Sequence, residues 1–201
     1  GGAGKVEVNI RFTGCQGFCE KGPLVVIQPN EIFYHGVKPE EAEEIVEKTI
    51  VNNEIIERLL YKDVKTKEKI IKESEVPFYK HQMRVIFGQN GLIDPTSIDD
   101  YIRIGGYSAL AKVLFKMTPE EVINEVDKAG LRGRGGGGFP AGRKWRSCRE
   151  AEGDIRYVIC NADEGDPGAY MDRSVLEGNP HSVLEGMIIG SYAIGSHDGF
   201  I

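Results

Sequence analysis

A run of glycines set between basic and aromatic residues is the feature that most restricts how this chain can fold. Residues 130–145 read GLRGRGGGGFPAGRKW, with four consecutive glycines at positions 135–138. Glycines let a backbone turn through positive φ and approach a ligand closely. Consecutive amide groups in such a turn converge on an anion, and neighbouring cations hold a phosphate. The cations here are Arg132, Arg134, Arg143 and Lys144.

A glycine run is also typical of a flexible linker, and composition alone favours that reading. The residues that bound this run argue against it, because Leu131, Phe139, Pro140 and Trp145 are apolar and favour burial. Phe139 and Trp145 also offer flat surfaces to an aromatic ring. The loop is therefore expected to bind a phosphorylated, ring-bearing ligand, such as a nucleotide or a flavin.

The two common phosphate loops do not describe this segment. Gly133, Gly135 and Gly138 match GxGxxG, but that fingerprint must follow a strand. A helix is expected upstream instead, with Thr118 as N-cap and Glu121 completing a capping box. Walker A fails as well, because Trp145 follows Lys144 where Ser or Thr is required. The loop is expected to be of another kind.

The overall composition excludes several function classes. The chain has 201 residues and a net charge of −6, which disfavours nucleic acid as a partner. No apolar run reaches the roughly 20 residues of a membrane span, and no signal peptide is visible. Four cysteines are too few for a disulfide scaffold. A cytoplasmic protein without direct membrane insertion is expected, and both ends look cut from something larger.

The first third of the chain predicts a small α+β module that ends near Leu60. Val6, Val8, Ile10 and Phe12 alternate with polar residues, as in a half-buried strand. Residues 24–28 and 32–35 predict a hairpin, and a helix is expected from Pro39. Residues 61–77 are rich in Lys and Glu and are expected to be an exposed linker.

The remainder predicts helices around one buried strand. Short helices are expected from a cap at Thr96 or Ser97 to Ile104, and over residues 107–115. Residues 156–160 (RYVIC) predict a buried strand. A helix is expected over 180–194 whose buried face is Val183, Leu184, Met187 and Ile188.

An acidic turn, NADEGDPG at residues 161–168, follows the predicted strand. Open α/β sheets bind ligands at this edge. A turn rich in Asx residues that only reverses the chain explains it equally well, and a divalent-metal site is a weaker alternative. A third interpretation is that the turn accepts hydrogen bonds from a ribityl chain or sugar. The candidate acceptors are Asn161, Asp163, Glu164 and Asp166.

A second candidate site is the segment TGCQGFCEKGP, which contains Cys15 and Cys19. A CxxxC pair on a glycine-flanked loop brings two thiolates within reach of one metal centre. Two cysteines do not complete a site that needs four ligands. A pair of buried or spare thiols is therefore an equally good interpretation from the residues alone.

The glycine-rich segment and the segment CNADEGDPGAYMDRSVLEGNPH together resemble the NADH-binding flavoprotein subunit of respiratory complex I. The chain is more similar still to the diaphorase (beta) subunits of NAD(P)-linked iron-only hydrogenases and formate dehydrogenases. The resemblance covers nearly the whole chain. It implies an α+β or α/β fold: a partial thioredoxin-like [2Fe–2S] ferredoxin segment at 1–60, a linker at 61–95, and the N-terminal half of an FMN/NADH-binding Rossmann-like domain at 96–201.

The resemblance also implies an activity, with one bound FMN that accepts a hydride from NADH and passes electrons singly to iron–sulfur clusters. The implied cofactors are FMN, NAD(H) or NADP(H), a [2Fe–2S] cluster, and a [4Fe–4S] cluster held outside this segment. Cys15 and Cys19 would be two of the [2Fe–2S] ligands. The implied cofactor contacts are Gly133, Arg134, Gly135, Gly136, Gly137, Gly138, Phe139, Lys144, Asn161, Asp163, Glu164 and Asp166.

The implied partners are a thioredoxin-like [2Fe–2S] subunit and a larger iron–sulfur, hydrogenase or formate dehydrogenase subunit, in an electron-bifurcating or NAD(P)-reducing complex. A non-catalytic electron-relay or scaffold subunit is the alternative. A metal-dependent phosphoryl-transfer enzyme is a third hypothesis, but it lacks a matching phosphate loop.

Overall fold

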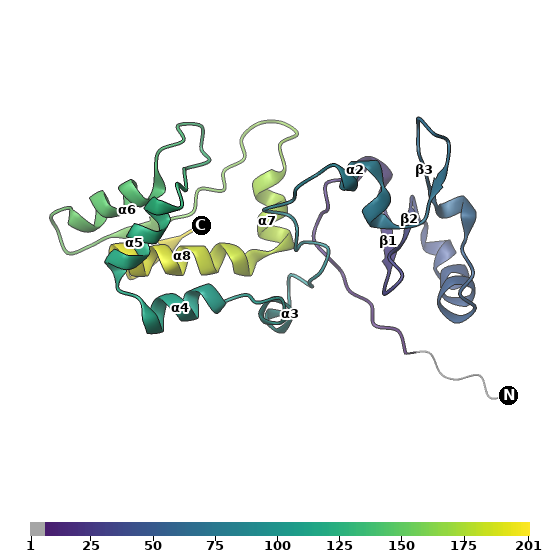
Figure 1. The fold of residues 1–201 in the computed structure, drawn as a ribbon, viewed down its shortest axis with the longest axis horizontal. Coiled ribbons are helices and arrows are strands. Elements are labelled where there is room, and N and C mark those ends of the chain that lie inside the picture. Colours follow the sequence, from purple (N-terminus) through teal and green to yellow (C-terminus); the bar gives the residue numbers. More distant parts are fainter. Residues whose placement is uncertain (1–6) are drawn as a thin grey trace. The chain divides into compact units, whose positions relative to one another are not determined.

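The computed structural model describes residues 7–201, so Val6 of the expected first strand lies outside the described part. The chain is a mixed α/β protein that divides into two compact units. Residues 7–11 and Cys15–Gly88 belong to the first unit, and Phe12–Gly14 and Gln89–Ile201 belong to the second. The colours in Figure 1 run along the sequence and allow the reader to follow the chain through each unit.

The first unit contains two short antiparallel sheets and several short helical segments. In chain order its elements are η1 (Cys19–Lys21), β1 (Leu24–Ile27), β2 (Ile32–His35), η2 (Pro39–Glu41), α1 (Ala42–Glu44), η3 (Ile45–Val51), η4 (Glu57–Leu59), β3 (Tyr61–Lys62), β4 (Lys69–Ile70), η5 (Glu73–Glu75) and α2 (Pro77–Lys80).

The hairpin expected over residues 24–35 is confirmed. Its register pairs Leu24 with His35 and Ile27 with Ile32. Tyr34 on β2 is fully buried, and its hydroxyl accepts a hydrogen bond from the Ile56 amide at 2.9 Å. The apolar body of the ring therefore fills the core while its polar end remains satisfied.

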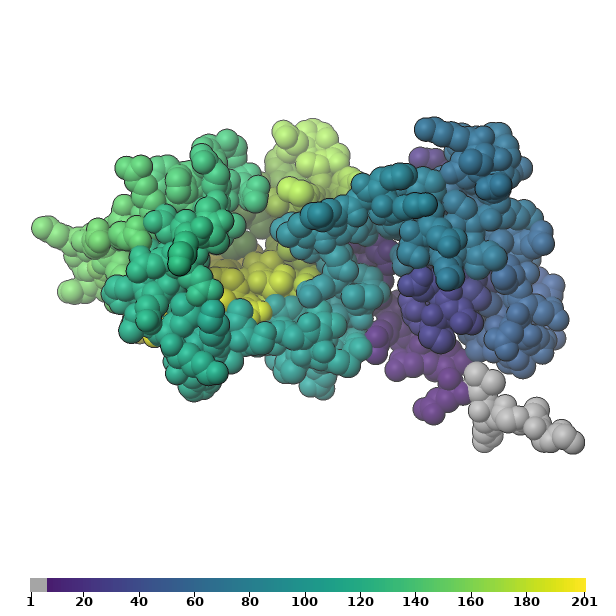
Figure 2. Space-filling view, in the orientation of Figure 1, coloured from purple at the N-terminus to yellow at the C-terminus, as the bar shows by residue number. Residues whose placement is uncertain are grey.

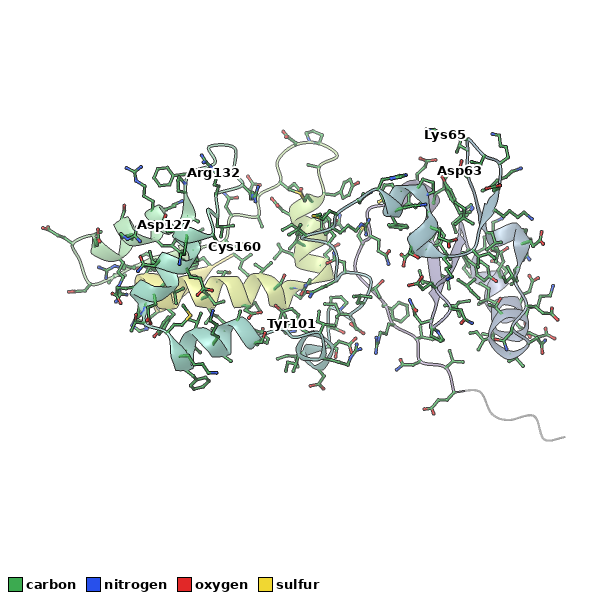
Figure 3. All side chains as sticks on the ribbon, in the orientation of Figure 1. Asp63, Lys65, Tyr101, Asp127, Arg132 and Cys160 are labelled. Carbon is green, nitrogen blue, oxygen red and sulfur yellow. The ribbon has the colours of Figure 1, made fainter. Side chains whose placement is uncertain are left out.

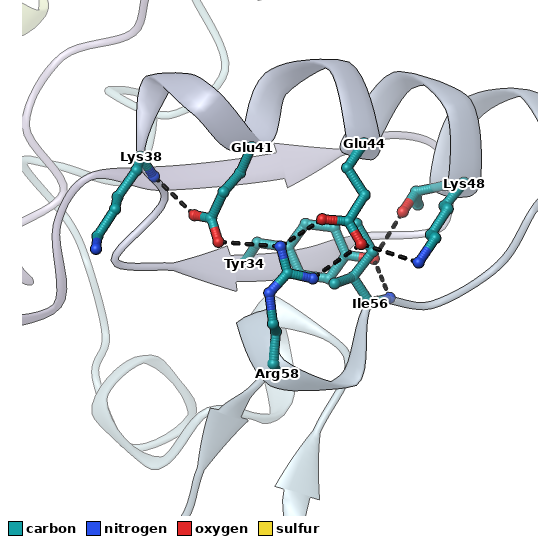
Figure 4. Close-up of polar contacts among 8 residues, drawn as sticks. Tyr34, Lys38, Glu41, Glu44, Lys48, Ile56 and Arg58 are labelled. Carbon is teal, nitrogen blue, oxygen red and sulfur yellow. Dashed lines mark hydrogen bonds and ion pairs between the residues drawn. The ribbon is translucent and has the colours of Figure 1, made fainter.

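The helix expected from Pro39 is confirmed as a continuous run of η2, α1 and η3. The Lys38 amide donates to the Glu41 carboxylate at 2.8 Å, which caps the start of the run. Arg58 bridges Glu41 and Glu44 (Figure 4). Hydrogen bonds from Arg58 and Lys48 lower the pKa of Glu44 to about 2.

Two expectations for this region are wrong. Residues 7–12 form no strand, and Val8, Ile10 and Phe12 are exposed. A strand needs a hydrogen-bonded neighbour at its edge and a packed layer over its apolar face, and within residues 7–201 no strand pairs with this segment. Local alternation alone is therefore not sufficient to place a strand.

The linker expected at 61–77 is a folded part of the first unit. It contains β3, β4 and η5, and Tyr61 and Val76 are buried in a cluster with Phe33. Asp63 closes the β3–β4 turn by accepting hydrogen bonds from the Lys65 amide at 2.6 Å and from the next amide (Figure 3). Two-residue strands are too short to give a periodic signal, which explains the error. Residues 81–97 do lack helix and strand.

The second unit consists of six helices and one pair of parallel strands within the described residues. Its elements are α3 (Ile98–Arg103), α4 (Ser108–Lys116), α5 (Pro119–Lys128), α6 (Ala141–Glu150), β5 (Tyr157–Ile159), α7 (Met171–Gly178), α8 (Pro180–Ile194) and β6 (Asp198–Phe200). Helix α8 contacts α4, α5, α6, α7 and both strands, so it is the central element of this unit (Figure 1).

The expected starts of α3 and α5 are confirmed. The Ser97 hydroxyl accepts the Asp100 amide at 3.2 Å. Thr118 and Glu121 form a reciprocal capping box at the start of α5. Gly130 follows α5 with φ +66°, the left-handed conformation in which glycine commonly ends a helix.

The predicted buried face of α8 is wrong, because Leu184 and Ile188 are 38% and 42% exposed. The side that packs inward carries a carboxylate, Glu185. It accepts hydrogen bonds from the Tyr101 hydroxyl at 2.5 Å and from the Tyr107 amide at 3.0 Å. The other buried residues of α8 are Gly190, Ala193 and Ile194.

The strand expected at 156–160 is present as β5, which pairs in parallel with β6. It is not buried, since Tyr157 and Ile159 are 53% and 72% exposed. No helix in the described part of the chain is long and apolar enough to cross a membrane.

Candidate functional site

The glycine-rich segment connects α5 to α6 as a loop whose two ends are pinned together. The Gly133 amide donates to the Phe139 carbonyl, and the Ala141 amide donates to the Leu131 carbonyl, both at 2.8 Å. An antiparallel bridge between Arg132 and Pro140 lies between these bonds. A loop closed at its base in this way is a defined structure and not a linker.

Two glycines of the loop adopt backbone conformations that other residues rarely take. Gly136 has φ +91° and Gly138 has φ +56°. A Cβ added at Gly135, Gly136 or Gly137 would meet no atom within 4 Å. The tip of the loop is therefore open and exposed (Figure 2), so its amides are accessible to an anion.

The basic residues of the loop divide into two roles. Arg132 donates its Nε–H to the Gly138 carbonyl at 2.6 Å, so this guanidinium holds the loop in shape (Figure 3). Arg134, Arg143 and Lys144 are exposed, and no carboxylate among the described residues forms an ion pair with them. Unneutralised cations beside an open loop suit a phosphate.

The start of α6 follows the loop directly, so its first amides add a partial positive charge there. Gly142, in its first turn, permits a close approach of α5, since a Cβ at this position would lie 2.7 Å from the Asp127 backbone. The glycine thus fixes where the helix start lies relative to α5.

The two aromatic residues of the segment differ in environment. Phe139 is 50% exposed, and the Arg143 guanidinium lies 5.9 Å from its ring centroid. Trp145 packs instead against the core cluster of α4, α5 and α8, with its ring 3.4 Å from a Cβ built on Gly190. The expectation that Trp145 offers a ligand surface is wrong, because it lies on the inward side of α6.

The acidic turn at 161–168 follows β5, as expected. The Asn161 side chain accepts the Asp163 amide at 3.0 Å, which is an Asx turn. Asn161, Asp163 and Asp166 are exposed. In Figure 1 this turn and the glycine-rich loop project from the same side of the second unit.

Glu164 has a structural role that the sequence did not reveal. Its carboxylate accepts the Asp172 amide at 3.0 Å and the Arg173 amide at 3.2 Å, so it caps the start of α7. Burial acts to raise the pKa of Glu164, but the hydrogen bonds from the amides of Asp172, Arg173 and Met171 lower it overall. The two oxygen atoms each accept one amide here, and a carboxylate has about four acceptor positions, so the expected contact of Glu164 with a ligand stays a prediction.

The CxxxC loop brings its two sulfur atoms together in the first unit. Cys15 and Cys19 are exposed, and their Sγ atoms lie 4.0 Å apart. Two thiolates on one tetrahedral metal, with bonds of about 2.3 Å, are separated by about 3.8 Å. The Gly17 amide donates to the Cys15 sulfur at 3.3 Å. The proximity of Cys15 raises the pKa of the Cys19 thiol, which binding of a cation would offset.

A tyrosine near these thiols, Tyr79, has a hydroxyl group that is buried without a hydrogen-bond partner within residues 7–201. Burial, the Glu73 carboxylate and the two cysteines all raise the pKa of Tyr79, so the thiols are within its electrostatic reach. The described residues contain no group of three or more His, Cys, Asp or Glu side chains that could hold a metal ion.

The part of the chain that carries the glycine-rich loop and the acidic turn is similar to a known protein family. Residues 126–201 match the Nuo51 FMN-binding domain family. The resemblance inferred from the two motifs is confirmed.

Two relatives illustrate the extent of the similarity. The NADP-reducing hydrogenase subunit HndC of Solidesulfovibrio fructosivorans is 57% identical over 122 residues, which are 61% of this chain and 24% of the relative. An NADH-quinone oxidoreductase subunit of Aquifex aeolicus is 54% identical over 105 residues, which are 52% of this chain and 24% of the relative. The chain thus spans about a quarter of the length of these relatives.

A solved structure of an NAD+-reducing [NiFe]-hydrogenase in its H2-reduced state is 27% identical. The match has a TM-score of 0.45 and covers 94% of this chain and 28% of that one.

The sequence did not reveal Tyr79 or Arg84, whose guanidinium contacts the CxxxC loop. Both lie in the expected linker. The aromatic pair Phe78-Tyr79 within a charged segment was the available signal for a buried cluster there.

Proposed function

We propose that the protein to which this chain belongs is the electron-input subunit of a multi-subunit NAD(P)-linked oxidoreductase. In this proposal the second unit binds FMN and the first is a thioredoxin-like ferredoxin segment. The observation that carries the proposal is the pinned, open glycine-rich loop with unpaired cations, within a segment that matches the Nuo51 FMN-binding domain. FMN, when bound, accepts a hydride from NADH or NADPH and releases its electrons one at a time.

The residues of the loop are proposed to hold the flavin phosphate. The amides of Gly135, Gly136 and Gly137 would bind the phosphate oxygen atoms, since the space beside these glycines is open. Gly133, whose amide binds the Phe139 carbonyl, and Gly138, whose carbonyl binds Arg132, would hold the loop in shape for them. Arg134 and Lys144 would neutralise the charge of the phosphate. Phe139 would lie against an aromatic ring of the cofactor or substrate, since half of its surface is exposed.

The acidic turn is proposed to accept hydrogen bonds from the ribityl or ribose hydroxyls. Asn161, Asp163 and Asp166 are exposed at the end of β5 and therefore accessible. Glu164 would contribute mainly by fixing the start of α7 beside the turn. Hydride transfer requires no separate general base, so the proposal assigns none.

The proposed partners follow from the names of the relatives. These relatives are named as subunits of a hydrogenase and of a quinone oxidoreductase. An iron–sulfur subunit, such as a thioredoxin-like [2Fe–2S] protein or a larger hydrogenase or formate dehydrogenase subunit, would receive the electrons. A [4Fe–4S] cluster would lie outside this segment. The cytoplasmic location stays a prediction.

The visible absorption spectrum of the purified full-length protein tests the proposal. We expect a flavin band that NADH or NADPH bleaches under anaerobic conditions, and release of FMN on denaturation. A matched preparation treated with a non-reducing nucleotide, NAD+, should keep its band. A colourless protein, or a flavin that neither nucleotide reduces, would contradict the proposal.

A further inference from the structure

An arginine from the irregular segment after α2 holds the middle of the CxxxC loop. Arg84 donates from Nη2 to the carbonyl of Gln16, which lies between the two cysteines in sequence. The same nitrogen lies 3.9 Å from a Cβ built on Gly17, whose φ is +83°. The guanidinium therefore lies against the backbone that positions Cys15 and Cys19.

Aromatic rings fix the position of this guanidinium. Its central carbon lies 4.7 Å from the centroid of Tyr79 and 5.8 Å from that of Phe78. Phe78 in turn stacks on Phe18, inside the CxxxC loop, with 4.3 Å between centroids. Cation–π contacts of this kind stabilise a partly buried cation, and Arg84 is half-buried.

The charge of Arg84 is available to the loop. In the described part of the chain no carboxylate forms an ion pair with it, and its Nε–H donates to the neutral Gln82 side chain at 3.2 Å. Glu73 lies within electrostatic reach of Arg84, and the pKa of its carboxyl is raised because burial outweighs the opposing influence of the Arg84 charge. A permanent positive charge beside two thiols stabilises additional negative charge there.

We propose that Arg84 is a positioning residue for an iron–sulfur centre held in part by Cys15 and Cys19. It fixes the loop through the Gln16 carbonyl, and its charge raises the reduction potential of the centre. One-electron reduction adds one negative charge to the centre, and a fixed cation favours that state. The inference rests on the proposed function, because the ferredoxin segment proposed there is the part that would hold this centre.

Redox titration of the full-length protein with dithionite, followed by low-temperature EPR and iron analysis, tests this role. Arg84→Gln removes the charge but keeps an N–H donor, and we expect a more negative midpoint potential. Arg84→Lys keeps the charge, so its potential should stay close to that of the wild type. The matched control is Arg58→Gln, because Arg58 belongs to the same unit but pairs with Glu41 and Glu44. It should not change the potential.

The outcomes separate this inference from the proposal on which it rests. A wild-type potential in Arg84→Gln, or an equal shift in Arg58→Gln, overturns the inference alone. Loss of iron from Arg84→Gln, with an unchanged near-UV circular dichroism spectrum and iron retained in Arg84→Lys, supports it. A wild-type protein that binds reducible FMN but no iron overturns both the cluster site and this inference, while the flavin proposal stands.

Discussion

Gly136 illustrates how one backbone conformation controls a binding loop. Its φ of +91° is accessible to glycine, and the space around its Cβ position is empty. Sterics with neighbouring atoms therefore do not explain a glycine here, whereas the conformation does. A side chain at this position would make the loop abandon the arrangement of amides that suits an anion.

Replacement of Gly136 by Val should weaken FMN binding at least about fivefold. Holding a β-branched residue in this region costs on the order of 1–3 kcal/mol, and about 1.4 kcal/mol corresponds to a factor of ten in affinity. Equilibrium binding, followed by quenching of FMN fluorescence, measures the loss. Gly137→Ala is the control, because Gly137 has equal space and no positive φ. Undiminished FMN binding by the Val variant would show that the loop has another role.

The start of helix α7 is capped by the side chain of Glu164, which lies seven residues before the first residue of the helix. Glu164 accepts hydrogen bonds from amides of the first turn, where four amide groups lack partners inside the helix. Negative charge at a helix start is also favourable to the helix dipole. The acidic turn is thereby tied to the helix that follows it.

The charge-neutral substitution Glu164→Gln should lower the melting temperature, and the effect should depend on pH. The folded state lowers the pKa of Glu164, so its contribution to stability is present above the ordinary pKa of a glutamate and is lost as the pH falls through the lowered value. The difference in Tm between wild type and variant should therefore shrink in acid. Thermal unfolding at several pH values measures it, with Asp163→Asn as control. Equal Tm values at neutral pH would contradict the capping role.

Helices α4 and α8 are coupled by the buried carboxylate of Glu185. It accepts the Leu110 amide at 3.0 Å, as well as the Tyr107 amide and the Tyr101 hydroxyl. Because Tyr107 and Leu110 belong to the start of α4, α8 caps α4 across the core. His181, one turn before Glu185, extends this contact through a 2.8 Å bond to the Tyr107 hydroxyl.

Glu185→Ala should destabilise the protein by about 2–3 kcal/mol, because buried donors lose their acceptor. Tyr101→Phe removes one of the three hydrogen bonds and should cost about 1 kcal/mol. Urea unfolding monitored by circular dichroism gives both free energies. A cost for Glu185→Ala no larger than that for Tyr101→Phe would refute the cross-helix cap.

The chain as a whole carries its two candidate sites in different compact units. The two thiols lie in the first unit, and the glycine-rich loop and acidic turn lie in the second. Each unit has its own buried clusters. Loss of one cofactor should therefore leave the other site folded.

Simultaneous replacement of Cys15 and Cys19 by Ala in the full-length protein should abolish the [2Fe–2S] EPR signal. The FMN content and the bleaching of the flavin by NADH should be unchanged, because the proposed flavin contacts lie in the other unit. Cys148→Ser tests whether loss of any thiol has this effect, and it should retain the signal. A [2Fe–2S] signal that survives the double replacement would end the assignment of these cysteines.

Local signals in the sequence were sufficient for features that neighbouring residues determine. The capping box of Thr118 and Glu121, the Ser97 cap and the hairpin all depend on contacts within a few residues. The two motifs were also distinctive enough to indicate a resemblance to the Nuo51 FMN-binding domain family, since the matched residues 126–201 contain both. Side-chain roles at the proposed flavin site stay predictions.

Only the tertiary structure decided which surfaces are covered and which polar groups are already occupied. Trp145 and Phe139 are both aromatic residues of the glycine-rich segment. The packing of α6 turns Trp145 inward and leaves Phe139 exposed. Glu164 is a candidate ligand acceptor in the sequence, and only the tertiary structure shows that it also caps α7. The sequence places Arg84 in a predicted linker, whereas the structure shows that it contacts Gln16 of the CxxxC loop, 68 positions away. The sequence alone determined the conformations that arise among neighbouring residues, whereas partners from distant segments decided burial and charge, because no local pattern encodes which segment covers another.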